Sequence, residues 1–278
     1  MVDVTVSLSL GVLATFVPLS VGLLAPKILA KRPSTKVTLW LVAAAAGVIF
    51  WFFLDVMGDA VELDVNQGFS RSYTPLEVTA HVILALTFAL GVGLLFGLEK
   101  RLSSPSYSSP TSAGAESRGV DSTRNSPFDG LSFAVATVAA LAVGFHALGE
   151  GVDIGSGLPY SSDILGAIGG FLPGLAYVLH KVLEGFVIGV FALISSAVSI
   201  RKIGILVALS GIPTVIGFFV GLPGILDPSY FFALGGAGAL YIEIKLVPLF
   251  SRRDRVYASI LPLLLGFYAM YFAGLFHS

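Results

Sequence analysis

Apolar residues run through this chain in long stretches that short polar segments interrupt. Eight stretches reach about 20 residues, the length that an α-helix needs to cross the hydrocarbon core of a bilayer. Their approximate ranges are 5–26, 37–61, 77–98, 131–155, 168–196, 203–224, 229–250 and 256–276. The pattern therefore predicts an all-α membrane protein with eight transmembrane helices.

Composition supports this prediction and limits the partners. The 278 residues are 55% hydrophobic and 12% charged, whereas a soluble domain carries about 25% charged residues. We therefore expect membrane lipid to cover much of the surface. The net charge of −1 argues against a nucleic-acid partner, because phosphate binding needs a basic surplus. Cysteine is absent, so disulfides and thiolate ligands are excluded.

The basic residues predict how the helices are oriented. Thirteen of the 16 Lys and Arg residues follow the first, third, fifth and seventh stretches, and only Arg71 lies in a loop on the other side. Cytoplasmic loops carry the excess of Lys and Arg, so both termini are expected outside. Segment 102–127 holds nine serines and three prolines, which predicts a flexible cytoplasmic loop within a single domain, 1–278.

Several ionisable residues interrupt the apolar stretches. Such residues cost about 2.5–3.5 kcal/mol each at the bilayer centre and usually face the interior of a helix bundle. They are Asp55 and Asp59 in the second stretch, His146, Glu150 and Asp153 in the fourth, His180, Lys181 and Glu184 in the fifth, and Glu243 and Lys245 in the seventh.

The fourth and fifth stretches share one motif. They read FHALGEG at 145–151 and LHKVLEG at 179–185, so each places a histidine four residues before a Glu-Gly pair. Residues four apart lie on the same helical face. If the two faces meet, His146, Glu150, His180 and Glu184 form an N₂O₂ set suited to a first-row divalent ion. The simpler alternative is two hydrogen-bonded pairs that only fix the packing.

Other polar residues suggest a path to this site. Asp153 lies three residues beyond Glu150 and shares its face. Asp55 and Asp59 on the second stretch, with Glu77 and His81 on the third, could form an anionic entrance that concentrates cations. Glu243 either lines the inner half of the path or pairs with a basic residue of another helix. Ordinary solvated loop charges remain the alternative for Glu77, and a local hydrogen bond for His81.

These motifs resemble those of the ZIP (ZRT/IRT-like) metal transporters. HALGEG and HKVLEG are similar to the family's paired His-x-x-Pro-Glu-Gly motifs, and LSGIPTVIGFFVG at 209–221 and GGAGALYIEIKLVP at 235–248 are similar to its next two helices. The resemblance covers residues 131–278 and is mostly topological before them.

The resemblance implies a 3+2+3 inverted repeat with helices four and five at the centre, and a homodimer in the plasma or inner membrane. It implies an elevator-like or rocking carrier, not an enzyme, that moves divalent metal toward the cytoplasm by alternating access. His146, Glu150, His180 and Glu184 would be the ligands. Zinc is the expected cargo, and iron, manganese, cadmium, cobalt and nickel are further candidates.

The sequence also departs from the family pattern. Ligands of a second metal in some family members are replaced by Ala147, Lys181 and Thr214. We therefore expect a single-metal site in which the Lys181 ammonium takes the place of a second cation and shares Glu150 or Glu184. Alternatively, Lys181 extends toward the interface or pairs with Asp153 alone.

Three rival functions fit the same residues, and one of them is a structural or receptor protein that has lost transport. A proton or organic-solute carrier could use Lys181 for binding and the His/Glu pairs as a proton relay. An intramembrane hydrolase could use a bound metal to activate water, although the His-Glu-x-x-His motif of metalloproteases is absent.

Overall fold

The computed structural model of the chain describes residues 4–30, 34–61, 75–103, 132–158, 170–195, 199–251 and 255–276. These residues form eight helices, and each helix is long and apolar enough to cross a membrane, as the sequence predicts. The helices are α1 (Val4–Leu29), α2 (Thr35–Val61), α3 (Pro75–Ser103), α4 (Phe133–Gly157), α6 (Phe171–Ile194), α7 (Ile200–Gly221), α8 (Ser229–Phe250) and α9 (Val256–Gly274).

The helix boundaries differ from the apolar stretches mainly at α3. This helix continues to Ser103 through Glu99, Lys100 and Arg101, because an α-helix can extend past the bilayer core once its backbone hydrogen bonds are formed. The predicted loop 102–127 lies outside the described residues beyond Ser103. The inverted repeat and the outside location of the termini remain predictions.

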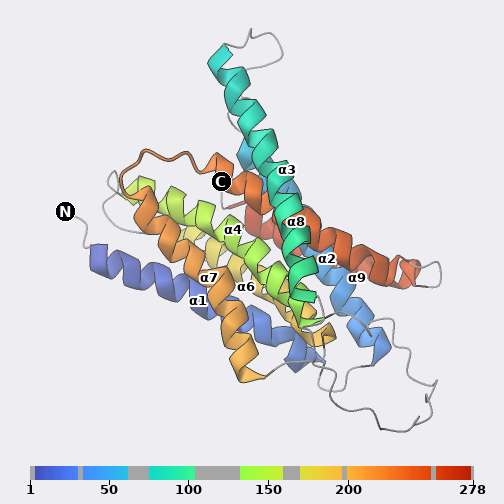
Figure 1. Cartoon of the computed structure of the whole chain (residues 1–278). Helices are drawn as coiled ribbons and strands as arrows, with labels where there is room; N and C mark the ends of the chain where they lie inside the picture. Colours follow the sequence, from blue (N-terminus) through green and yellow to red (C-terminus); the bar gives the residue numbers. More distant parts are fainter. Residues whose placement is uncertain are drawn as a thin grey trace, which may run out of the picture.

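The helices pack as two groups. In the first, α7 lies along α4 and α1 lies along α6; in the second, α2 packs on α8 and α9, and α3 packs on α8. Contacts of α4 with α8 and of α2 with α6 join the groups. Helices α4 and α6 are the most buried, whereas α3 lies at the edge of the bundle and its N-terminal part extends past its neighbours (Figure 1). The central pair predicted from the sequence is therefore central in the bundle.

Glycines set the spacing within each group. A Cβ at Gly151 of α4 would overlap the backbone of Thr214 in α7, and a Cβ at Gly185 of α6 would overlap the backbone of Leu19 in α1. Close backbone approach at small residues is a common way for membrane helices to associate. The helices that carry the two motifs are thus each held against a supporting helix.

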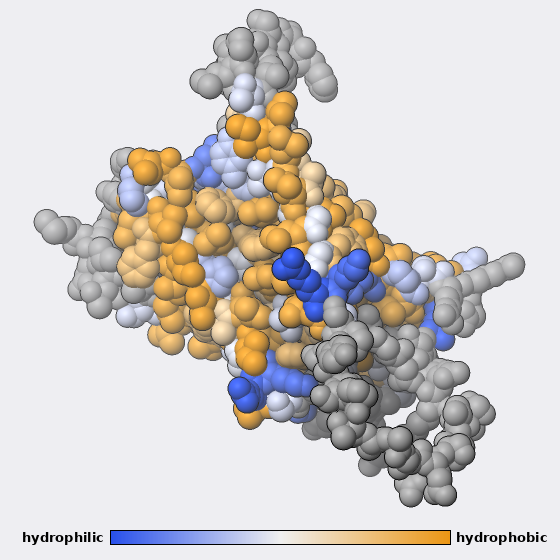
Figure 2. Space-filling model, viewed as in Figure 1, coloured by the Kyte–Doolittle hydropathy of each residue, from blue (hydrophilic) through white to orange (hydrophobic). Residues whose placement is uncertain are grey.

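The outer surface is apolar. Leu86, Leu90 and Leu94 project from α3, and Leu265 and Phe272 project from α9. Figure 2 shows hydrophobic residues over most of the visible face. Such a surface suits contact with lipid chains, whereas His146, Glu150, His180, Lys181 and Glu184 are buried inside the bundle.

Candidate metal centre

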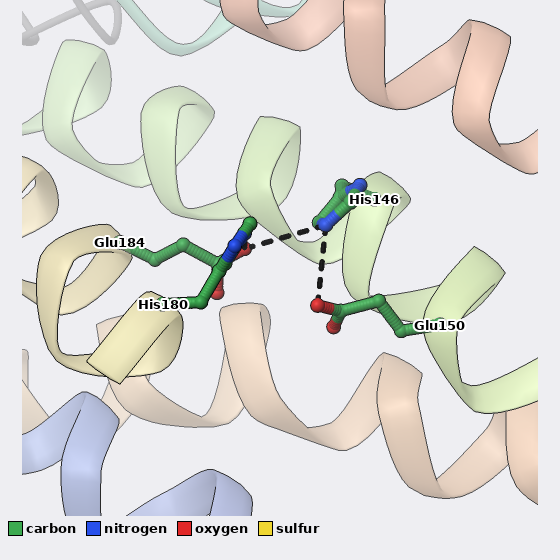
Figure 3. A group of neighbouring side chains, drawn as sticks. All are labelled: His146, Glu150, His180 and Glu184. Atoms are coloured by element: carbon green, nitrogen blue, oxygen red, sulfur yellow. Dashed lines mark ion pairs between the residues drawn. The ribbon is translucent and has the colours of Figure 1, made fainter. Parts of the chain in front are cut away.

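The four predicted ligands come together in the centre of the first helix group. His146 and Glu150 project from α4 toward His180 and Glu184 on α6 (Figure 3). One ligand atom from each residue lies within 4.8 Å of the others. All four residues are at most 2% exposed. The four-residue spacing therefore places each pair on the interior face of its helix.

Three distances within the cluster, whose ligand atoms are up to 4.8 Å apart, are close to those expected around a small divalent ion. The Nε2 atom of His146 lies 3.2 Å from Oε1 of Glu150 and 3.7 Å from Oε1 of Glu184. Nε2 of His180 lies 3.4 Å from the same Glu184 atom. A tetrahedral ion with ligands at about 2.0–2.1 Å has ligand atoms about 3.3 Å apart. The ligand set can therefore close around such an ion with small side-chain movements.

The polar atoms that converge lie within ion-pair distance of one another. Among the described residues, Nε2 of His146 and Oε1 of both Glu150 and Glu184 are buried without a hydrogen-bond partner. Buried polar atoms are nearly always paired, so such atoms need an explanation. A cation between them would supply one. The arrangement is compatible with an ion site, and the His146–Glu150 and His180–Glu184 pairs are also close enough to fix the packing.

Lys181 completes the charge arrangement. Its side chain is fully buried, and its Nζ atom contacts Oε2 of Glu150 and lies 2.6 Å from Oε2 of Glu184. The ammonium therefore occupies one side of the carboxylate pair, while the Oε1 atoms face the histidines. Lys181 contacts both glutamates, whereas the sequence predicts contact with one, and its side chain is buried and does not extend toward an interface.

A buried tyrosine holds the other side of Lys181. The Nζ atom lies 5.5 Å from the centre of the Tyr177 ring, within the range of a cation–π contact. The Tyr177 hydroxyl is hydrogen-bonded to Thr15 of α1 at 2.8 Å. This chain of contacts ties the charged centre to the supporting helix α1.

The second helix group contributes aromatic rings to the centre. Phe52 of α2 packs edge-on against His146, with ring centroids 4.6 Å apart, and Phe232 of α8 lies 5.6 Å from the same ring. Neither ring could be assigned to the site from sequence, because the apolar stretches contain many similar residues. An aromatic ring beside a histidine is visible only after the helices are packed.

The remaining predicted path residues lie outside the cluster. Asp153 is exposed on α4. Asp55 lies beside α9. A Cβ added at Gly274 of α9 would be 3.4 Å from Oδ1 of Asp55 and 3.0 Å from Nε1 of Trp51. Glu243 is partly buried on α8, and its Oε2 has no hydrogen-bond partner among the described residues. Their roles in a path remain predictions.

The predicted entrance is described only in part. The side chains of Asp59 and Glu77 lie outside the described residues, and His81 is partly buried near the start of α3. Thr214, at a position where the family resemblance implies a lost ligand, is 7% exposed, and its hydroxyl has no hydrogen-bond partner in the described part of the chain.

A second charged contact, which the sequence does not predict, joins α8 to α3. Lys245 of α8 bonds Glu99 of α3, with Nζ 2.8 Å from Oε1, and the Tyr241 hydroxyl donates to the same carboxylate at 3.2 Å. The Lys245 ammonium also lies 5.3 Å from the Phe96 ring. Glu99 falls just past the third apolar stretch, so only the long-range packing reveals its partner.

No protein-family profile matches this chain, and no curated protein is significantly similar to it in sequence. The class of this protein is therefore described from its fold and its buried cluster. The chain is an eight-span helical membrane protein with a buried His/Glu cluster that is compatible with an intramembrane metal site.

Proposed function

We propose that this protein is a ZIP-like carrier that moves divalent metal ions, with zinc as the main cargo, across the membrane toward the cytoplasm. The observation that carries the proposal is the convergence of two imidazole nitrogens and two carboxylate oxygens inside a membrane-spanning bundle. Such residues are costly in a membrane and usually mark an ion path. The motifs at 145–151 and 179–185 support the resemblance to the ZIP transporters. Because that resemblance implies a homodimer, we propose that the carrier is a homodimer.

The helix arrangement supports alternating access. All four proposed ligands belong to α4 and α6, which are backed by α7 and α1, whereas α2 and α8 place Phe52, Phe232 and Gly235 against His146. In the proposed cycle, the first group carries the cation and shifts relative to the second. Because the ligands are at most 2% exposed, the centre must open before an ion can enter or leave.

The lysine shapes the chemistry of this carrier. Lys181 compensates one carboxylate charge, so a single divalent ion is the expected load. A site of imidazole and carboxylate ligands without thiolates accepts several first-row ions. Iron, manganese, cobalt, nickel and cadmium are therefore proposed as alternative cargo.

The test uses the purified full-length chain. Elemental analysis should find one zinc per chain, and His180→Ala should weaken zinc binding by more than about 100-fold, because even outer-shell changes cost 10–100-fold. His277→Ala removes the histidine next to the end of the sequence and serves as the control. In liposomes containing a metal-sensitive dye, a zinc gradient should drive uptake. Absence of uptake for every ion named above would refute the carrier.

One observation favours a second candidate, a carrier of protons or of an organic solute. The Lys181 ammonium is fully buried at the centre, and an organic carboxylate could replace one of its glutamate partners. This candidate predicts proton or solute flux into liposomes without any metal, and it predicts that His180→Ala leaves solute binding intact.

A further inference from the structure

Phe52 is the side chain of α2 that lies against both histidines of the metal centre. Its ring centroid is 4.6 Å from that of His146 at an interplanar angle of 76°, and 5.5 Å from that of His180 at 59°. The two imidazoles are stacked 5.5 Å apart. Phe52 is 2% exposed. One phenyl ring therefore covers the pair of imidazoles from the side of the second helix group.

The α7 and α1 sides of the ligand helices are closed in a different way, whereas Phe232 of α8 also places a ring beside His146. Gly151 brings α4 onto the backbone of α7, and Gly185 brings α6 onto the backbone of α1. Backbone contacts of this kind leave no side chain that could swing aside. On the α2 side, the closing group is a side chain with its own rotamers, on a helix that carries none of the four ligands.

We propose that Phe52 seals the metal centre on the α2 side and thereby sets how fast a cation enters and leaves. The inference rests on the proposed function, since it takes a metal ion as the occupant. Aromatic rings at these separations are in direct contact, so an ion cannot pass between Phe52 and the imidazoles. Either the ring rotates away or α2 shifts relative to α4 and α6.

The proposal separates rates from affinity. Phe52 offers no ligand atom, so its removal leaves the coordinating set unchanged. A smaller side chain should speed binding and release together and leave their ratio nearly the same. A ring that only stabilised the fold would lower the stability of the protein without this signature. Phe52 therefore acts by covering the centre and not by binding the ion. The rates of ion binding and release are the quantities that test this role.

The experiment uses the full chain in lipid nanodiscs with cobalt(II) as the probe. Cobalt is loaded, its visible absorption is recorded, and its release into excess chelator is followed by stopped flow. Phe52→Ala should release cobalt about tenfold faster or more. Its dissociation constant should stay within about threefold of the wild type, because a threefold change is less than 1 kcal/mol.

Three further variants make the outcome decisive. Phe52→Leu fills much of the ring volume and should keep nearly the wild-type rate. Phe52→Val should be intermediate and replaces the alanine variant if that one does not fold. Phe53→Ala removes the neighbouring ring, which packs on Phe88 with centroids 6.5 Å apart, and should release cobalt at the wild-type rate.

The results also distinguish this inference from the function on which it rests. Wild-type release rates in Phe52→Ala, or equal acceleration in Phe53→Ala, would overturn the sealing role and leave the metal carrier intact. A wild-type protein that binds no cobalt, zinc or other cation would overturn the metal site itself, and the role of Phe52 with it.

Discussion

Lys181 is the residue that most alters the chemistry of the centre. Two carboxylates alone would hold two negative charges between α4 and α6, where charge is poorly solvated. The ammonium contacts Oε2 of both glutamates and leaves the Oε1 atoms directed at the histidines. The Oε2 atom of each glutamate is thus paired with Lys181, and the Oε1 atom of each is left available to a cation.

Reversing the charge of Lys181 should create a second cation site. In Lys181→Glu, three carboxylates replace two carboxylates and an ammonium, so a second divalent ion is needed to balance them. Elemental analysis should then find two zinc ions per chain. Lys245→Glu changes a lysine outside the centre and should leave the ratio at one. An unchanged ratio in Lys181→Glu would contradict the role assigned to the ammonium.

Removing the charge of Lys181 should destabilise the metal-free protein. Breaking a buried ion pair costs about 3–5 kcal/mol, so the melting temperature of Lys181→Met should fall well below that of the wild type. Zinc should restore much of it, since the ion replaces the lost positive charge. The control is Lys245→Met, whose pair with Glu99 is 22% and 17% exposed and should therefore contribute less than the fully buried Lys181 pairs. Equal losses in both variants would contradict this prediction.

At the level of the helix, the centre depends on how closely α4 and α6 are held by their supporting helices. Gly151 lies directly after the ligand Glu150, and Gly185 directly after Glu184. Each glycine faces a neighbouring backbone, so the ligand on the adjacent residue is directed away from it and into the centre. The glycine of each motif therefore allows close packing against a neighbouring helix, and the glutamate supplies a carboxylate to the centre.

A single methyl group at Gly151 should therefore disturb the ion site. In Gly151→Ala the new Cβ would overlap the Thr214 backbone, which pushes α4 away from α7 and displaces Glu150. We expect a lower melting temperature and at least about tenfold weaker zinc binding. The control Gly93→Ala adds a Cβ with nothing within 4 Å. That variant should be neutral or gain about 0.4–1 kcal/mol, and similar losses in both variants would refute the packing argument.

The sequence predicts the helices and the cluster of candidate ligands because both follow from short-range patterns. A stretch of about 20 apolar residues is sufficient to predict a membrane helix, and the four-residue spacing of His146 and Glu150 is sufficient to place them on one face. Phe52 and the Glu99–Lys245 pair could not be predicted. The latter joins residues 146 positions apart, and such contacts depend on how the helices pack.

At the level of the whole molecule, the two helix groups meet mainly where α4 lies along α8. The ligands lie on one side of this contact and the covering rings of Phe52 and Phe232 on the other. If cargo moves by displacement of the first group, the α4–α8 contact must slide. Contacts between helices of the same group can stay fixed during this displacement.

Cross-links can separate these two kinds of contact, because the chain has no cysteine of its own. A Cβ at Gly238 of α8 would lie 2.9 Å from that of Ala142 in α4, and a Cβ at Gly91 of α3 would lie 2.8 Å from that of Ala237 in α8. Both pairs are close enough for a disulfide after a small shift. We expect the α4–α8 disulfide made by Ala142→Cys with Gly238→Cys to stop liposomal zinc uptake until it is reduced.

The link within the second group is the matched control. Gly91→Cys with Ala237→Cys joins α3 to α8, so uptake should continue after oxidation. Both linked proteins should still bind zinc. Continued uptake through an oxidised α4–α8 link would contradict relative movement of the two groups.

The buried ammonium has a consequence for the energetics of a full cycle. With neutral histidines, the centre carries one net negative charge when empty and one net positive charge when a dication is bound. A membrane potential that is negative inside does about 2.3 kcal/mol of work per charge per 100 mV. It would draw the loaded centre inward and drive the empty centre outward. In the proposed carrier, a site with this lysine would therefore be assisted by voltage in both directions of its travel, whereas the same site without the lysine would be electrically neutral when loaded.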